Sequence, residues 1–177
     1  MCIIIDTNCL ADVFNKESKR HKEFKPVLDW ILHDIGKMVV GGSKYKDELR
    51  RNGTARRFVQ ILRQKANKVI LIEDNAVDNW QKKIEIKINH PDFDDPHLPA
   101  MVIVGKCHLI CSGDLRSVEH VTRKDIYPKG IQPPKYYTRL RNADLLCAKN
   151  IDKRYLPLHK CTKYVRTFLE EKLEQKR

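Results

Sequence analysis

The sequence predicts an α/β protein with three α/β/α layers, in which a central parallel β-sheet lies between helices. Three observations predict it: short apolar, β-branched segments recur along the chain, segments with one apolar helical face lie between them, and Gly, Asn or Asp residues stand where these segments end. Right-handed crossovers would place helices on both faces of the sheet. With 177 residues, the chain is long enough for one such domain and an appendage.

Strands and helices alternate over the first two-thirds of the chain. The predicted strands are residues 2–5, 37–40, 68–72 and 108–111. The predicted helices lie between them, at 8–15, from Pro26 to Gly36, 44–51, 54–65, from Asp74 onward and 98–105. Pro fits the first turn of a helix, and Ser43 and Thr54 are good N-caps for the two helices that follow them.

The last third differs in composition. Residues 121–136 contain three Pro and one Gly and predict a long loop, which is followed by helices over 136–148 and 159–176. We therefore expect a core at 1–121 and a basic loop and helical C-terminal extension at 122–177 that packs on the core. A fifth strand is not obvious, and 117–121 is the candidate. The apolar side of the last helix, with Val165, Phe168 and Leu169, could pack on its own sheet or dock a second copy in a homodimer.

The charge distribution favours a polyanionic partner. The net charge is +12, and residues 121–177 hold 15 Lys and Arg against 6 Asp and Glu. Basic surfaces attract nucleic acids because each neutralised phosphate releases counterions. No apolar run has the length of a membrane span, and the apolar N-terminus lacks a basic flank and is interrupted by Asp6. We expect a cytoplasmic protein without a membrane partner.

The six cysteines are irregularly spaced, and no two form a CxxC pair. Cys107 and Cys111 flank His108, but a second ligand pair at zinc spacing is missing. Free, partly buried thiols are therefore the expectation, with a zinc site as the alternative.

Four acidic residues are predicted to meet at one edge of the sheet. Asp6 directly follows the first strand, and Asp114 follows the fourth after a Ser-Gly turn. Glu48 lies on the helix after the second strand, and Asp95 opens the helix before the fourth. Ligands of parallel sheets bind outside the carboxyl ends of the strands, where these side chains would lie.

Crowded carboxylates resist ionisation unless a cation joins them, and oxygen donors suit Mg²⁺ or Mn²⁺. Such an ion can activate water for attack on a phosphodiester. Each acid alone is explained equally well by the preference of Asp for turns and helix N-caps. Asp47 competes with Glu48, which has the longer reach, and Asp94 competes with Asp95.

Three segments carry a resemblance to a known family. The segments IIIDTNCL, SKYKDELR and DDPHLPAMVIVGKCHLICSGD, within residues 2–120, resemble the PIN-domain family of metal-dependent nucleases. In that family an apolar strand ends in Asp-Ser/Thr-Asn, and the fourth strand ends in Ser/Thr-x-Asp. The resemblance implies a five-stranded parallel sheet, and acidic metal ligands at Asp6, Glu48, Asp95 and Asp114.

The same resemblance assigns supporting roles and shows one departure. Asn8 and Ser112 would orient the carboxylates or the water, and the DPH motif favours Asp95 over Asp94. After Asp114 many family members have a further acidic or polar residue near the next turn, whereas this chain reads Leu115-Arg116-Ser117. Ser117 or Glu119 could substitute, so the presence of a second metal ion stays open.

The expected function is a divalent-metal-dependent endonuclease that hydrolyses phosphodiester bonds, with RNA as the substrate that the resemblance implies. Small PIN proteins are often toxins of toxin–antitoxin pairs, which would make an antitoxin the protein partner; other members mature ribosomal RNA or act in host defence. The alternatives are a nucleic-acid-binding module that has lost catalysis and a phosphatase that acts on a small substrate.

Several residues outside the acidic set could contact the nucleic acid. Lys44, Lys46 and Arg116 flank the predicted acidic edge and could bind phosphates. Tyr136, near Arg139 and Arg141, could stack on a base. His97 follows Asp95 by two residues, and we expect it to be a first-turn helix residue rather than a proton donor.

Overall fold

The computed structural model describes residues 2–147, 153–155 and 159–174 of the chain. It is an α/β fold around a five-stranded sheet whose strands pair in parallel in the order β3-β2-β1-β4-β5. The strands are β1 (Cys2–Ile5), β2 (Lys37–Val40), β3 (Val69–Leu71), β4 (Leu109–Cys111) and β5 (Lys135–Tyr137). The coarse prediction of a parallel sheet flanked by helices is confirmed.

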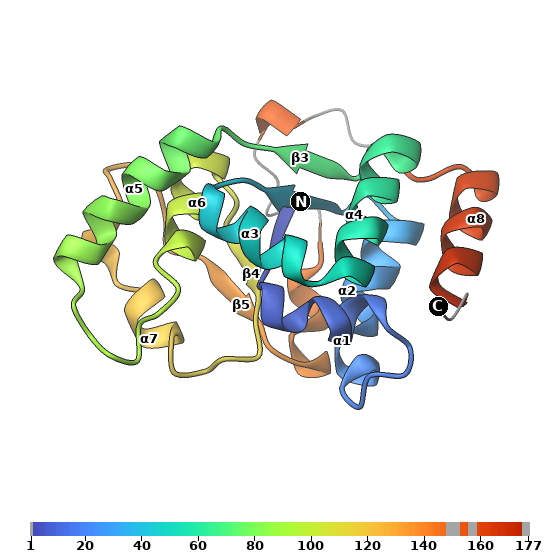
Figure 1. Cartoon of the computed structure of the whole chain (residues 1–177), viewed down its shortest axis with the longest axis horizontal. Coiled ribbons are helices and arrows are strands. Elements are labelled where there is room, and N and C mark those ends of the chain that lie inside the picture. The colour runs from blue at the N-terminus through green and yellow to red at the C-terminus, as the bar shows by residue number, and fades with distance from the viewer. Residues whose placement is uncertain (1, 148–152, 156–158, 175–177) are drawn as a thin grey trace.

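Helices cover both faces of the sheet (Figure 1). They are α1 (Leu10–Phe14), α2 (His21–His33), α3 (Ser43–Arg51), α4 (Gly53–Ala66), α5 (Asp74–Lys87), α6 (His97–Gly105), α7 (Val118–Val121) and α8 (Lys163–Glu174). Short 3-10 helices cover Thr7–Cys9, Lys124–Ile126, Leu140–Leu145 and Lys153–Tyr155. Figure 1 shows α2, α4 and α8 on one side of the sheet and α5 and α6 on the other, with α3 in front of the strand ends.

β1 is the centre of the sheet, and all four of its residues are buried. Its neighbours are β2, with Ile3 opposite Met38, and β4, with Ile5 opposite Cys111. A parallel strand that is covered on both faces is expected to be apolar throughout, as the segment CIII is. Because β1 and β4 run side by side in parallel, the residues that follow them come to the same edge.

The fifth strand is not where the sequence suggested. Residues 117–121 were the candidate, but Val118–Val121 is the helix α7. The strand is instead β5, within the segment expected to be a loop and the start of a helix over 136–148, of which Ala148 lies outside the described residues. Tyr137 fixes β5 because its ring is buried and its hydroxyl donates to the Glu23 carbonyl at 2.8 Å. The sheet therefore crosses the expected boundary between residues 121 and 122.

Helix α2 begins at His21, five residues before the expected start at Pro26. Phe24 is fully buried on the same apolar side as Val27, Leu28 and Ile31, so the packing extends one turn further than the sequence suggested. His21 is also buried, and its Nδ1 lies 2.9 Å from the Asp12 carbonyl oxygen. Pro26 is accommodated inside the helix.

Two predicted N-caps are also wrong. Ser43 is the first residue of α3, and its hydroxyl donates to Asp78 at 2.6 Å. Helix α4 is capped by Asn52, whose side-chain oxygen accepts from the Ala55 amide at 3.0 Å, rather than by Thr54. At α3 the Ser43 side chain binds Asp78 of α5 instead of capping its own helix, and at α4 the cap is a residue two positions earlier than predicted.

The apolar side of α8 packs on its own chain. Leu169 is fully buried, Val165 and Phe168 are partly buried against the core, and α8 contacts α4 and α2. Leu169 on this side is therefore taken up by packing within the chain, and Val165 and Phe168 are partly covered. Of the helix expected over 159–176, residues 175 and 176 lie outside the described part of the chain.

Cys2, Cys9, Cys107 and Cys111 are buried free thiols. Among the described residues, Cys107, His108 and Cys111 do not form a metal-ligand group. No helix in the described ranges has both the length and the apolar character that crossing a membrane requires.

Candidate metal centre

Asp6 lies at the carboxyl end of β1 and is 2% exposed. Its backbone N–H continues the sheet ladder by donating to the Cys111 carbonyl at 2.9 Å. Its carboxylate accepts a hydrogen bond from the Ser112 hydroxyl at 2.7 Å and from the Asn8 amide at 3.2 Å. Burial raises the pKa of Asp6, and the charge of Glu48 adds to this increase. Ser112 thus contacts this carboxylate through its side chain and Asn8 through its backbone amide, and the orienting roles that the resemblance implies for them stay a prediction.

Glu48 is positioned by contacts near the start of its helix, α3. Gly42 precedes α3 with a φ of 83°, a left-handed conformation that glycine adopts without strain. The Gly42 amide donates to Asp74 at 2.9 Å, and the Tyr45 hydroxyl donates to the Ile5 carbonyl at 2.6 Å. These contacts fix α3 against α5 and the end of β1. The Glu48 carboxylate then accepts a hydrogen bond from the Thr7 hydroxyl at 2.7 Å.

Asp95 immediately precedes Pro96 and α6 and faces the same group of acids. Burial raises the pKa of Asp95 to about 7, and the charges of Asp6, Asp94 and Glu48 contribute, whereas Lys44 opposes the shift. The Lys44 ammonium lies 3.7 Å from the Asp95 carboxylate and also donates to the Asp94 carbonyl. Asp94 is exposed, so Asp95 is the acid of this pair that faces the site.

His97 is the first residue of α6, as the sequence predicted, but its contact with the acids was not predicted. Its side chain is fully buried, with Nε2 3.7 Å from the Glu48 carboxylate and Nδ1 3.7 Å from the Asp95 carboxylate. Neither ring nitrogen has a hydrogen-bond partner among the described residues. Burial, and then the charge of Lys44, lowers the pKa of His97 to about 3, so the imidazole is neutral and retains a free lone pair.

The donor atoms of Glu48, Asp95 and His97 all lie within 4.8 Å of one another. In the described residues this is the single such group of three or more His, Cys, Asp or Glu side chains. The sequence does contain a sign that His97 belongs to this group. It is the one titratable side chain in the otherwise apolar helix HLPAMVIVG. Buried polar groups usually have a hydrogen-bond partner, so an imidazole without one is available to bind a cation together with Glu48 and Asp95.

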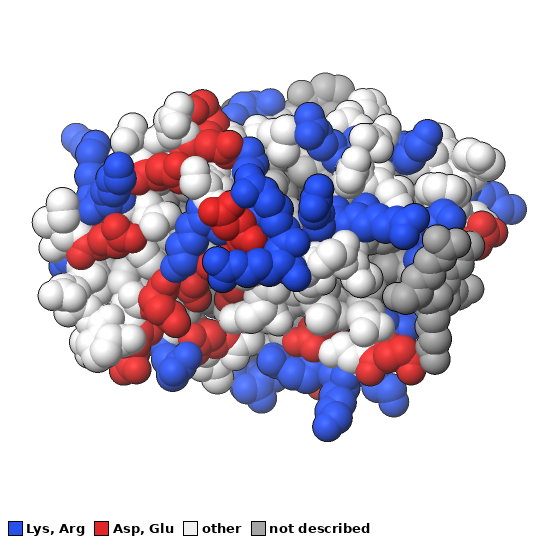
Figure 2. Space-filling model, viewed as in Figure 1, with Lys and Arg blue, Asp and Glu red and all other residues white. Residues whose placement is uncertain are grey.

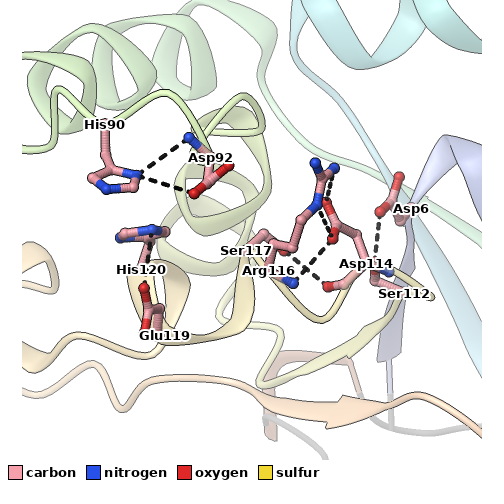
Figure 3. A network of polar contacts seen from close by, with 9 residues as sticks. All are labelled: Asp6, His90, Asp92, Ser112, Asp114, Arg116, Ser117, Glu119 and His120. Carbon is pink, nitrogen blue, oxygen red and sulfur yellow. Dashed lines mark hydrogen bonds and ion pairs between the residues drawn. The ribbon is translucent and has the colours of Figure 1, made fainter.

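The fourth predicted acid, Asp114, has a different environment. Ser112 connects it to Asp6, because the Ser112 hydroxyl accepts from the Asp114 amide at 3.0 Å while it donates to Asp6 (Figure 3). The Asp114 carboxylate, however, accepts from Nε and Nη2 of Arg116 at 3.0 and 3.1 Å. This pairing lowers the pKa of Asp114. Asp114 thus lies beside the site but is held by Arg116.

Ser117 and Glu119 do not supply the missing second-site ligand. The Ser117 hydroxyl donates to the Asp114 carbonyl at 3.2 Å, and Glu119 points to His120, 3.4 Å away. Figure 3 shows His120 next to His90, apart from Asp6, and their ring centres are 4.6 Å apart.

The residues predicted to bind nucleic acid differ in how accessible their charged or aromatic groups are. Lys46 pairs with Asp74 at 2.5 Å, so it, Lys44 and Arg116 are all partly neutralised by acids. Tyr136 belongs to β5, and its hydroxyl is buried. Burial raises the pKa of Tyr136, and the charges of Asp6, Asp95 and Asp114 add to this increase.

Arg139 and Arg141 are exposed. Arg141 belongs to the 3-10 helix at Leu140–Leu145, which packs on α2, and Arg139 immediately precedes this helix.

A groove of about 480 Å³ leads away from the centre between α3 and α5. Lys44, Glu48 and Arg51 line it on α3, and Asp78 and Lys82 line it on α5. Glu48 is therefore reached from solvent through a polar cleft.

The donor set fits a divalent cation that accepts both oxygen and nitrogen. Two carboxylates and a neutral imidazole match Mn²⁺ and other first-row ions, whereas Mg²⁺ prefers oxygen ligands and water. The hydroxyls of Thr7 and Ser112 fix the carboxylates of Glu48 and Asp6, as supporting groups do around protein-bound metals.

The chain was compared with models of known protein families, with curated proteins and with solved structures, and none of them matches it.

Proposed function

We propose that this chain is a divalent-metal-dependent nuclease that hydrolyses phosphodiester bonds in RNA. The observation that carries the proposal is the convergence of Glu48, Asp95 and the neutral, orphaned His97 at the carboxyl edge of the sheet, beside buried Asp6. A bound divalent ion would lower the pKa of a water molecule and neutralise charge on the phosphate. RNA as the substrate follows from the resemblance to the PIN-domain family.

In this proposal the chain's own residues have separate roles. Glu48, Asp95 and His97 hold the ion, with Mn²⁺ favoured over Mg²⁺ by the imidazole. Asp6 supplies a further negative charge at the strand end, fixed by Ser112 and the Asn8 amide. Lys44 lies against Asp95 at the mouth of the groove, where it can contact a phosphate.

The test is cleavage of labelled RNA in Mn²⁺ by the wild type and by Asp6→Asn. The substitution is close to isosteric but removes the carboxylate charge, and it should abolish cleavage. Asp29→Asn is the matched control, because Asp29 is exposed on α2 and pairs with Lys25. Full activity in a clean Asp6→Asn preparation would contradict the proposal.

The cellular role belongs to the same proposal. Activity as the toxin of a toxin–antitoxin or defence system predicts that expression of the wild type arrests growth and that Asp6→Asn relieves the arrest. Growth arrest by both proteins would argue against a role of the nuclease in toxicity.

A binding module that has lost catalysis is the second candidate, and the pairing of Asp114 with Arg116 favours it. Calorimetric titration separates the two: Mn²⁺ binding that depends on His97 supports the nuclease, whereas no binding at millimolar Mn²⁺ supports the binding module.

A further inference from the structure

The outward side of α4 is strongly basic. Helix α4 buries Ala55, Phe58, Val59 and Leu62, which recur at the spacing of one helical face. The opposite face is exposed and carries Arg56, Arg57, Gln60, Arg63 and Gln64. We call Arg51, Arg56, Arg57 and Arg63 the α4 arginine surface.

Within the described residues, Arg56, Arg57 and Arg63 have no internal counter-charge, whereas Arg51 shares a groove with acidic side chains. From Arg50 to Lys68 the sequence contains seven Lys and Arg and neither Asp nor Glu. Across the part of the chain that the structure describes, no ion pair or hydrogen bond involves the side chain of Arg56, Arg57 or Arg63. Unpaired neighbouring cations repel one another, so this surface is best stabilised by an anion from outside the chain.

The α4 arginine surface adjoins the candidate metal centre. Arg51 ends α3 and lines the same groove as Glu48 and Lys44, and α4 begins two residues later. Figure 2 shows Lys and Arg side chains around the acidic residues at the position of α3 and continuing towards α4. From Arg56 to Arg63 the helix rises about 10 Å, so the surface can follow several phosphates.

We propose that the α4 arginine surface binds the backbone of a single-stranded nucleic acid whose adjoining phosphodiester lies at the metal centre. The inference rests on the proposed function for the choice of ligand. A lipid surface fits less well, because none of the large exposed apolar side chains among the described residues (Leu71, Ile86, Leu115, Leu140 and Tyr164) lies on α3 or α4. A membrane-binding helix needs such apolar anchors.

Binding is measured by fluorescence anisotropy with a labelled 20-nucleotide oligouridine, in chelator and in the Asp6→Asn background, so that cleavage does not interfere. The test protein carries Arg56→Glu, Arg57→Glu and Arg63→Glu. The matched control carries Lys124→Glu, Lys129→Glu and Lys135→Glu, which are exposed near α7 and β5 and change the net charge equally. Thermal unfolding of both variants verifies that each is folded.

We expect the α4 variant to bind the oligonucleotide at least about tenfold more weakly than the control. The slope of log affinity against log salt should fall by about 2, since three phosphate contacts are lost. Equal affinities in the two variants would overturn the inference. Binding of wild-type protein to anionic phosphatidylserine vesicles, lost in the α4 variant while RNA affinity is unchanged, would assign the surface to a membrane instead.

The experiments can refute RNA binding by the α4 arginine surface and the proposed nuclease activity independently of each other. If RNA binding depends on the α4 arginines but no cleavage occurs in Mn²⁺, the surface stands and the nuclease is refuted. If cleavage depends on Asp6 but RNA affinity is insensitive to these arginines, the nuclease stands and the surface is refuted.

Discussion

His97 differs from the acids around it because it offers a neutral nitrogen donor. Its replacement by Asn keeps a polar side chain and exchanges the nitrogen donor for an amide oxygen. We expect His97→Asn to weaken Mn²⁺ binding by roughly tenfold or more and to affect Mg²⁺ binding less, because imidazole favours the softer ion. Calorimetric titration with each ion measures both effects. Equal losses for the two ions would show that His97 supports the fold rather than selecting the metal.

The Asp95 carboxyl makes the metal-free protein sensitive to pH. Its folded-state pKa is raised to about 7 by burial and by Asp6, whereas the unfolded value is about 3.9. At a pH between these two pKa values, the Asp95 carboxyl is ionised in the unfolded chain but protonated in the folded protein. The free energy of unfolding therefore falls as the pH rises from about 4 to about 7.

Asp95→Asn removes this dependence. In chelator, the free energy of unfolding of the variant minus that of the wild type should be roughly 1–3 kcal/mol larger at pH 8 than at pH 5. Thermal unfolding at both pH values measures the change, with Asp29→Asn as an exposed control. A stability difference between Asp95→Asn and the wild type that is the same at both pH values would contradict the assignment.

The Arg116 guanidinium holds Asp114 by two side-chain hydrogen bonds, which compete with a cation for the carboxylate, and the Arg116 backbone amide adds a third. Arg116→Ala should therefore tighten Mn²⁺ binding or add a second bound ion. Arg123→Ala is a matched control, because Arg123 pairs with Asp125 through Nε and Nη2 at 3.0 and 2.7 Å, also two residues apart. A calorimetric affinity and stoichiometry that are both identical in the two variants would show that Asp114 takes no part in metal binding.

At the scale of elements, the sequence predicted well what local pattern determines. The apolar run CIII and the turns after it located β1 and Asp6, and the Ser-Gly-Asp turn located Asp114 beside it. Strand β5 was missed because KYY is too short to show a period, and its place depends on the contact of Tyr137 with Glu23.

For the candidate site too, the sequence pattern predicted the order of the elements but not the packing of the side chains. The approach of Asp6, Glu48 and Asp95 follows from the order of strands and helices, which the sequence pattern contains. The burial of His97 between Glu48 and Asp95 and the capture of Asp114 by Arg116 depend on side-chain packing, which a linear pattern does not contain.

At the scale of the whole molecule, the last third of the chain contributes to two parts of the fold. It supplies β5, which pairs with β4 through Leu109, Ile110 and Cys111, and it supplies α8, which covers α4 and α2. These contributions differ in their distance from the metal centre. Strand β4 leads directly into Ser112, whereas α8 lies across the sheet from α6.

Two truncations follow from this difference. A chain that ends at residue 121 lacks β5 and leaves the apolar strand β4 as an open edge, so we expect it to aggregate or remain unfolded. A chain that ends at residue 161 keeps all five strands and loses α8 with buried Leu169, which should cost about 2–5 kcal/mol of stability. The longer chain should still bind Mn²⁺. Circular dichroism and calorimetry measure both outcomes, and a folded, metal-binding chain of 121 residues would refute the role assigned to β5.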